Sequence, residues 1–126
     1  MQISQERPEL PRETWQDFFQ RLSSEYRDYA VTIEVIDPQL GDQLQAADVS
    51  LSDLEYDPKD DVLIIAVESQ DRSKQAVLRH LIEQPQTILA DQLTDEVRWA
   101  IDASDKDGTQ TIVTLARRPR LPPPGE

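Results

Sequence analysis

Val62-Leu63-Ile64-Ile65-Ala66-Val67 is the one stretch of the chain in which six apolar residues follow one another without a break. Most of these residues are β-branched, and apolar side chains occupy both the odd and the even positions. A strand of this composition buries both of its faces, so we expect it in the middle of a sheet or of a barrel wall. The segments on either side are then predicted to cover it.

An amphipathic helix is predicted from Leu10 onward. Pro11 suits the first helical position, because its missing N–H costs no hydrogen bond there, and Glu13 places a negative charge in the first turn. Apolar residues then recur at helical spacing and form one stripe: Trp15, Phe18, Phe19, Leu22 and Tyr26. Aromatic stripes at this spacing are usually core, so we expect the helix to pack inside its own domain.

A half-apolar strand and a bulged strand are predicted before the central stretch. Residues 29–36 alternate between apolar and polar side chains, as a strand with one buried face does. Between residues 44 and 51 the apolar phase slips, which predicts a β-bulge near Ala47-Asp48.

The last part of the domain is predicted to be a hairpin. Residues 97–101, which include Trp99, and residues 113–116 both alternate between apolar and other side chains. Asp107-Gly108 lies between them, and both residues tolerate the positive φ that tight hairpin turns need.

Residues 75–91 leave two alternatives open. Their apolar residues have helical spacing and Pro85 would end such a helix, so periodicity alone slightly favours a helix. If the segment is a strand, alternate residues share one face, and the break at Pro85 fits an edge or a bulge. These face-sharing residues are Ala76, Leu78, His80 and Ile82.

The chain of 126 residues is long enough for one domain with a real core. We expect a flexible arm at residues 1–9, one domain at residues 10–116, and a disordered tail rich in arginine and proline at residues 117–126. The predicted class is α+β: the helix packs on a curved, mostly antiparallel sheet of five or six strands, as an SH3- or Sm-like small barrel or, alternatively, a flat sheet. The expected core includes Trp15, Phe18, Phe19, Leu22, Tyr26, Ile64, Ala66, His80 and Trp99.

This order of elements resembles a family of small bacterial proteins known only as a domain of unknown function. The resemblance is carried by Leu10-Pro11-Arg12-Glu13-Thr14-Trp15 with Phe18 and Phe19, Val31-Thr32-Ile33-Glu34-Val35, Asp37, Leu40, Gly41, His80-Leu81-Ile82-Glu83-Gln84-Pro85 and Asp107-Gly108. It covers residues 10–116 and leaves the tail outside. It implies strand rather than helix at residues 76–90, and it implies no activity, cofactor or partner, because the family has none assigned.

The charge of the chain argues against nucleic acid and anionic membranes as partners. The net charge is −12, and residues 1–116 alone carry 24 acidic and 10 basic side chains, a net charge of −14. Binding to a phosphate backbone needs clustered lysine and arginine, which this part of the chain lacks. The N-terminus has no apolar signal core, and no apolar run approaches the roughly 20 residues of a membrane span, so we expect a soluble cytoplasmic protein.

Several kinds of chemistry are absent from the sequence. It contains no cysteine, which excludes disulfides, thiolate metal sites and cysteine nucleophiles. Its three glycines stand apart, so there is no glycine-rich phosphate loop. His80 is the one histidine, and its place between Leu78 and Ile82 indicates a structural role rather than a catalytic base. We therefore expect no enzyme activity, no catalytic residues and no cofactor.

Two acidic turns and the tail hold the residues predicted to contact a partner: Asp57, Asp60, Asp61, Asp105, Asp107, Pro119 and Pro122. The second turn imitates part of a calcium loop, but Ala103 and Thr114 occupy the positions that need its first and last carboxylates, so no metal site is expected. The two prolines form a fragment of a polyproline ligand.

The sequence thus predicts a non-enzymatic interaction or accessory protein that contacts another protein, or itself, through its acidic surface or an exposed strand edge. Two alternatives remain: a module that responds to a small ligand or a divalent metal at the acidic turns, and a hydrolase with a convergent pair of carboxylates.

Overall fold

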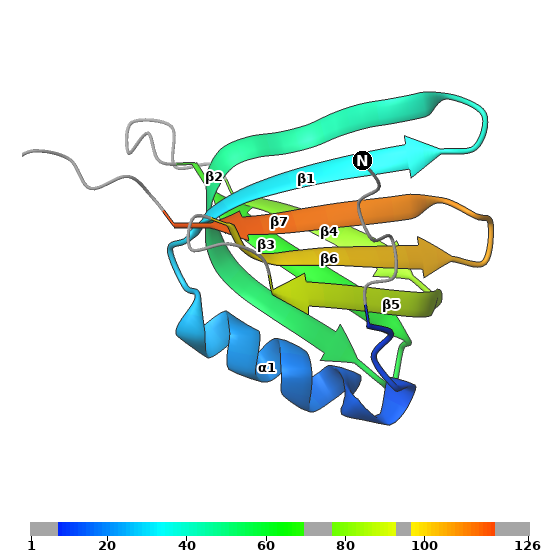
Figure 1. Cartoon of the computed structure of the whole chain (residues 1–126), viewed down its shortest axis with the longest axis horizontal. Helices are drawn as coiled ribbons and strands as arrows, with labels where there is room; N and C mark the ends of the chain where they lie inside the picture. Colours follow the sequence, from blue (N-terminus) through cyan, green and yellow to red (C-terminus); the bar gives the residue numbers. More distant parts are fainter. Residues whose placement is uncertain (1–7, 70–76, 93–96, 118–126) are drawn as a thin grey trace, which may run out of the picture.

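The structure is a computed structural model that describes residues 8–69, 77–92 and 97–117 (Figure 1). The described residues form one α-helix, α1 (Trp15–Glu25), which follows a short 3₁₀ turn (Arg12–Thr14), and one antiparallel sheet of seven strands. The strands are β1 (Ala30–Asp37), β2 (Gly41–Asp57), β3 (Val62–Glu68), β4 (Val77–Glu83), β5 (Pro85–Gln92), β6 (Val97–Asp105) and β7 (Gln110–Ala116). The α+β class, the N-terminal helix and the antiparallel sheet are confirmed.

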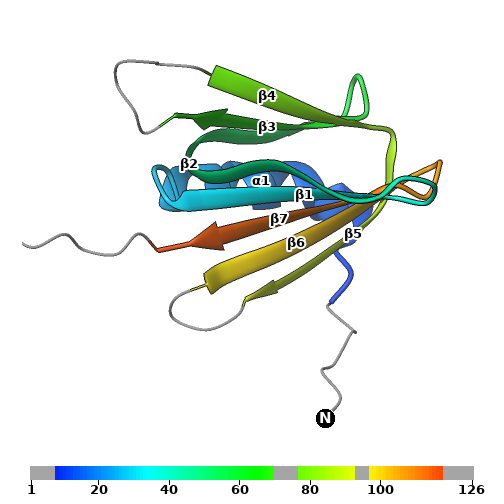
Figure 2. The same cartoon turned by 90° about the horizontal axis from the view of Figure 1, so that it is seen from above.

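The sheet has the order β4-β3-β2-β1-β7-β6-β5. The long strand β2 bends, so that its first part pairs with β1 and its last part pairs with β3. The predicted bulge lies in this bend: Val31 is opposite Val49 and Ile33 is opposite Ala46, so Ala47 and the next residue together oppose a single residue of β1. The bend carries β3 and β4 behind the other strands (Figures 1 and 2).

The two edge strands of the sheet follow each other in the sequence. Only Gln84 separates β4 from β5, and it adopts a positive φ of 54° and donates its N–H to the carbonyl of Asp61 at 2.8 Å. The sheet therefore curls until its edges meet at one end, while its strands fan apart at the other end (Figure 2). Among the described residues β4 and β5 do not pair, so the sheet is not closed.

The prediction of five or six strands was wrong, and the SH3- or Sm-like barrel is not confirmed. Residues 77–92 form two strands rather than a helix or one interrupted strand. The physical reason lies in Gln84-Pro85: the proline has no N–H to continue a ladder, and the positive φ of Gln84 turns the chain away from β3 toward the other edge of the sheet.

The helix packs its aromatic stripe into the curled sheet. α1 lies along the last part of β2 and covers one side of the sheet (Figure 1). Trp15, Phe19 and Leu22 are buried, whereas Phe18 and Tyr26 are half-buried against the same core. The Trp15 indole N–H donates to the carbonyl of Leu10 at 3.0 Å, and ring contacts at 5.1 and 5.3 Å join Trp15 to Tyr56 and Phe18 to the half-buried Trp99. No described helix has the length and apolar character that crossing a bilayer requires.

Strand β3, which holds the six-residue apolar run, is second from the edge of the sheet and not at its middle. Leu63, Ile65 and Val67 are buried in the core. Ile64, expected in the core, points to the opposite face and is half-buried, while Ala66 on that face is buried. The apolar residues of the second face therefore belong to the outer surface of the sheet.

The two edge strands of the sheet differ in whether another segment of the chain is hydrogen-bonded to their outer side. Beside β5, the N–H of Leu10 donates to the carbonyl of Ile88 at 2.8 Å, and the N–H of Ala90 donates to the carbonyl of Pro8 at 3.0 Å. Pro8 and Glu9, predicted to belong to a flexible arm, thus lie against this edge, and residues 1–7 are outside the described part of the chain. No described segment pairs with the free side of β4.

Candidate functional site

The acidic residues of the two predicted turns bind the backbone of their own turns. The carboxylate of Asp57 accepts the N–H of Lys59 at 2.9 Å. The carboxylate of Asp105 accepts the N–H groups of Asp107 and Thr109 at 2.9 and 3.1 Å. These contacts are those of ordinary side-chain-capped turns. Within residues 8–69, 77–92 and 97–117 no group of three or more acidic or histidine side chains is arranged to hold a metal ion.

Asp61 belongs to a polar cluster that ties the start of the helix to the sheet. Its carboxylate accepts the hydroxyl of Tyr56 at 2.6 Å and the guanidinium of Arg12 at 3.1 Å. The guanidinium also donates to the carbonyl of Pro85 at 2.8 Å and lies over the ring of Trp15, 4.4 Å from its centroid. Burial, and then the hydrogen bond to Asp61, raise the pKa of Tyr56. The exposed Asp60 is not part of this cluster.

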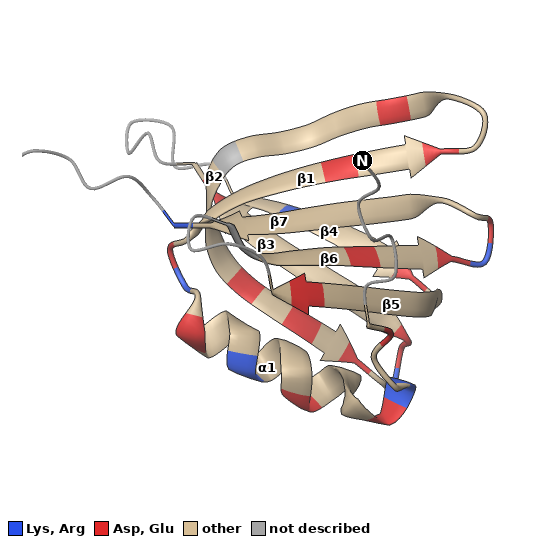
Figure 3. Ribbon diagram, in the orientation of Figure 1, with Lys and Arg blue, Asp and Glu red and all other residues tan. Residues whose placement is uncertain are grey.

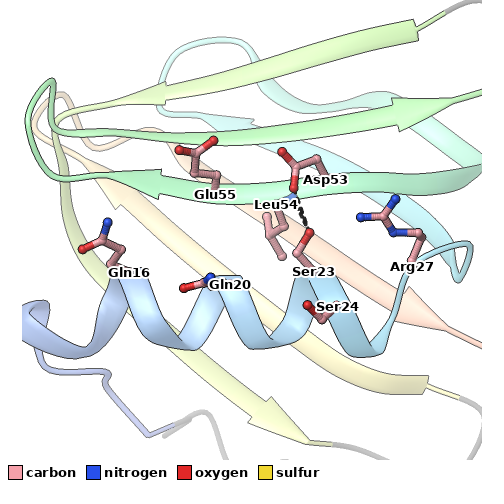
Figure 4. A pocket seen from close by; sticks show the side chains of 8 residues that line it. All are labelled: Gln16, Gln20, Ser23, Ser24, Arg27, Asp53, Leu54 and Glu55. Carbon is pink, nitrogen blue, oxygen red and sulfur yellow. Dashed lines mark hydrogen bonds between the residues drawn. The ribbon is translucent and has the colours of Figure 1, made fainter.

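A polar groove of about 340 Å³ runs along the surface where α1 meets the last part of β2 (Figure 4). The Ser23 hydroxyl donates to the carboxylate of Asp53 at 2.8 Å and accepts the N–H of Leu54 at 3.2 Å, so it fastens the helix to the strand. The carboxylates of Asp53 and Glu55 both line the groove, but both residues are exposed and Leu54 is the apolar residue among those that line it. The other lining residues are polar or charged: Gln16, Gln20, Ser23, Ser24 and Arg27.

His80 is half-buried on the core side of β4, directly opposite Ile65. Burial lowers its pKa, because desolvation penalises the charged ring. Its neighbours on the same face are Leu78 and Ile82, as predicted from the alternation. Pro119 and Pro122, the predicted contact residues of the tail, lie outside the described residues.

The outer face of β2, β3 and β4 carries three parallel columns of side chains. The register places Glu55, Ile64 and Leu81 side by side in one row. In the rows from Asp53 to Asp57 the column on β2 is acidic, the column on β3 is apolar, and the column on β4 is mixed. Figure 3 shows the acidic residues on the last part of β2 in red. We call this surface the outer face; it consists of Asp53, Glu55, Asp57, Val62, Ile64, Ala66, Glu68, Val77, Arg79, Leu81 and Glu83.

Large apolar side chains are exposed along β4. Val77 is 64% exposed and Leu81 is 51% exposed on the outer face, and Leu78 is exposed on the other side of the strand. The side chains of Arg79 and Glu83 form no hydrogen bond or ion pair within the described part of the chain. An edge strand with exposed apolar residues and no pairing partner is the arrangement that other strands bind.

The backbone groups that β4 offers can be identified from the ladder. In an antiparallel pair, every second residue directs its N–H and C=O toward the neighbouring strand. Gln84 is bonded to Asp61, which lies opposite it in the continued register. If one counts back from Gln84 in steps of two, the even residues of β4 are those that bind β3. The odd residues therefore direct their N–H and C=O groups to the free edge. These odd residues are Val77, Arg79, Leu81 and Glu83.

The sequence pattern that corresponds to this surface indicates burial rather than exposure. The two apolar faces of Val62–Glu68 indicate burial in the middle of a sheet, whereas one of those faces is the apolar column of the outer face. In β4, the helical spacing of the apolar residues obscures the alternation of Val77, Arg79, Leu81 and Glu83. None of these four was predicted as an interaction residue.

Comparison with known proteins identifies relatives without a known activity. Residues 6–124 match the sequence profile of a family described as a family of unknown function, DUF5335. An uncharacterized protein of Aquifex aeolicus (strain VF5) is 34% identical over 116 residues, which are 91% of this chain and 95% of that protein. No solved structure matches the chain. The predicted resemblance to a bacterial domain of unknown function is confirmed.

Proposed function

We propose, from the premise that the chain belongs to the DUF5335 family of unknown function, that it is a non-enzymatic protein that binds another polypeptide through the free edge of β4. The observation that carries this proposal is the outer side of β4: this strand pairs with β3 on one side, and no segment within residues 8–69, 77–92 and 97–117 pairs with its other side. Its odd residues direct backbone groups to the edge, and Val77 and Leu81 remain exposed beside them. Strand addition combines these two features, because backbone hydrogen bonds give affinity and alternate side chains give specificity.

The charges around the edge favour a polypeptide over a nucleic acid or an anionic membrane. The acidic column on β2 lies two strands from the edge, and the net charge of the chain is −12. Such a surface repels phosphate groups. The interaction role and a cytoplasmic location, which fits a chain without cysteine, are both parts of this proposal.

A photo-reactive phenylalanine analogue placed at Leu81 tests the proposal in living cells of the native host. We expect covalent adducts with a polypeptide after illumination, since the side chain lies beside the edge where a partner strand would pair. The matched control carries the same analogue at Leu40, which is 72% exposed but lies in the turn between β1 and β2. Equal adduct yields at both positions, or none at either, would contradict the proposal.

The groove between α1 and β2 supports a second candidate, a small-ligand role. The carboxylate of Glu55 and the guanidinium of Arg27 line the same groove, so it offers both charges to a zwitterionic or amine-bearing molecule. Thermal melts with a panel of amino acids and polyamines test this role. A raised midpoint that disappears in a Glu55→Gln variant would support it, and melts that no compound shifts would remove it.

A further inference from the structure

We infer that the partner of β4 is a second copy of this chain, paired antiparallel to it about a twofold axis at Leu81. This inference rests on the proposed function, because it names the partner of the same edge. Two copies would then share one continuous sheet, with the two outer faces on the same side. A twofold axis makes such a contact self-complementary, so each copy supplies both halves of every cross-strand pair.

The backbone allows only some registers between two β4 strands. The odd residues of each strand direct their N–H and C=O groups to the free edge, so odd residues must lie opposite odd residues for the ladder to form. Registers that place Leu81 opposite the partner's Leu81, Arg79 opposite the partner's Leu81, or Arg79 opposite the partner's Arg79 all meet this condition.

The charges of β4 select one of these registers. With Leu81 on the axis, Arg79 lies opposite the partner's Glu83, and the symmetry repeats this pair on the other side. Directly opposite residues of unlike charge stabilise a sheet, whereas like charges in the same place destabilise it. A register with Arg79 on the axis opposes two guanidinium groups, and the intermediate register leaves both charges opposite apolar residues. The sequence arginine, leucine, glutamate at alternate positions is therefore complementary to itself only when antiparallel and centred on Leu81.

The neighbouring residues extend this complementarity on both sides of the axis. Ile64 lies beside Leu81 in the register, so the selected pairing gives a continuous apolar row of two isoleucines and two leucines across the contact. Glu83 borders a hollow of about 290 Å³ whose lining also includes Asp105, Lys106 and Asp107. Three carboxylates and one ammonium group thus surround the place where the partner's Arg79 arrives, which favours a cation there.

Exchange of the two charges tests the pairing directly. Sedimentation equilibrium of the full chain is expected to show a dimer. Arg79→Glu and Glu83→Arg, made singly, each place like charges opposite each other twice per dimer, so each should raise the dissociation constant about tenfold or more. The double variant restores both pairs and is expected to recover dimerisation to within a few fold. All these side chains are exposed, so circular dichroism should report an unchanged fold.

A single cysteine tests the register, and the chain offers a clean background because it contains none. Leu81→Cys places two thiols opposite each other on the axis, where the Cα atoms of a hydrogen-bonded pair are about 5.5 Å apart and within disulfide range. Mild oxidation is expected to give a covalent dimer. Val77→Cys is the matched control on the same strand, since its two copies would lie about eight residues apart and should remain reduced.

These outcomes separate the inference from the proposed function. A monomer by sedimentation that still forms position-81 adducts with a different protein would overturn self-pairing and leave strand addition at β4 intact. A dimer that neither single charge variant weakens, or in which Val77→Cys is oxidised faster than Leu81→Cys, would overturn the proposed register. Absence of both a dimer and any adduct would overturn the inference and the proposed function together.

Discussion

At the scale of single residues, the polar cluster around Asp61 is the clearest case of side chains that act together. Arg12 and Asp61 are 49 positions apart in the sequence and contact each other directly, and Tyr56 contacts both. The hydroxyl of Tyr56 donates to Asp61 and accepts from Arg12, at 2.6 and 3.2 Å, while its ring packs perpendicular to that of Trp15. The tyrosine therefore connects the acidic turn to the core.

Removal of this hydroxyl is expected to destabilise the fold modestly. Tyr56→Phe keeps the ring and deletes the donor to Asp61, which should lower the free energy of unfolding by about 1 kcal/mol, as for a typical intramolecular hydrogen bond. Tyr29→Phe is the control, because the side chain of Tyr29 makes a ring contact with Tyr26, which the change preserves. Urea denaturation followed by circular dichroism measures both, and equal losses would contradict the assignment.

His80 is expected to make stability depend on pH. Its pKa is lower in the folded chain than in the unfolded one, since burial penalises the charged ring. The unfolded state therefore binds the proton first as pH falls, and stability is lost below the unfolded pKa of about 6.5. Urea denaturation between pH 7.5 and pH 5.5 should show a smaller loss for His80→Gln than for the natural chain. Parallel curves for the two would refute the role.

At the scale of elements, the attachment of α1 to the sheet rests on its buried stripe. Phe19 is fully buried, and Phe19→Ala should lower the free energy of unfolding by about 3–5 kcal/mol, as cavity-forming changes of this size do. Gln20→Ala alters the exposed neighbour and should stay within about 0.5 kcal/mol of the natural chain. If the two variants lost similar amounts of free energy of unfolding, the buried stripe would not be what attaches the helix to the sheet.

The elements also show what could be predicted from the sequence. The stripe from Trp15 to Tyr26, the bulge at Ala47 and the hairpin at Gly108 were predictable, because each depends on residues close together in the chain. The number of strands was not predictable from the sequence, because it depends on the turn at Gln84, which directs the chain to the other edge of the sheet. The candidate surface was also missed. A strand with apolar residues on both faces has the same sequence pattern whether both faces are buried or one face lies on the outer surface of the sheet.

At the scale of the whole molecule, the negative charge of the chain opposes the contact that β4 offers. Two copies of charge −12 repel each other over distances set by the salt concentration. The screening length falls from about 30 Å at 0.01 M salt to about 8 Å at 0.15 M. Salt therefore weakens the long-range repulsion between two copies more than it weakens the short-range attraction of the charge pairs at the strand edge.

Self-association is accordingly expected to strengthen as salt rises. Sedimentation equilibrium in 0.01 M and 0.15 M NaCl should give a lower dissociation constant at the higher concentration, because screening removes the long-range repulsion. A chain that ends at Ala116 carries −14 instead of −12 and should respond more steeply. A dissociation constant that increases with salt would show that the local charge pairs outweigh the net charge.

The hydrogen bonds that bind Pro8 and Leu10 to β5 have a consequence for the size of any assembly. They cover the middle of the second edge of the sheet, at Ile88 and Ala90, so a further strand cannot pair along β5 without displacing them, and we expect pairing to stop at two copies. If this segment were cut away, every molecule would offer two unpaired edges, and addition could continue from copy to copy into an open-ended fibre. Pro8, Glu9 and Leu10 thus separate a finite complex from polymerisation.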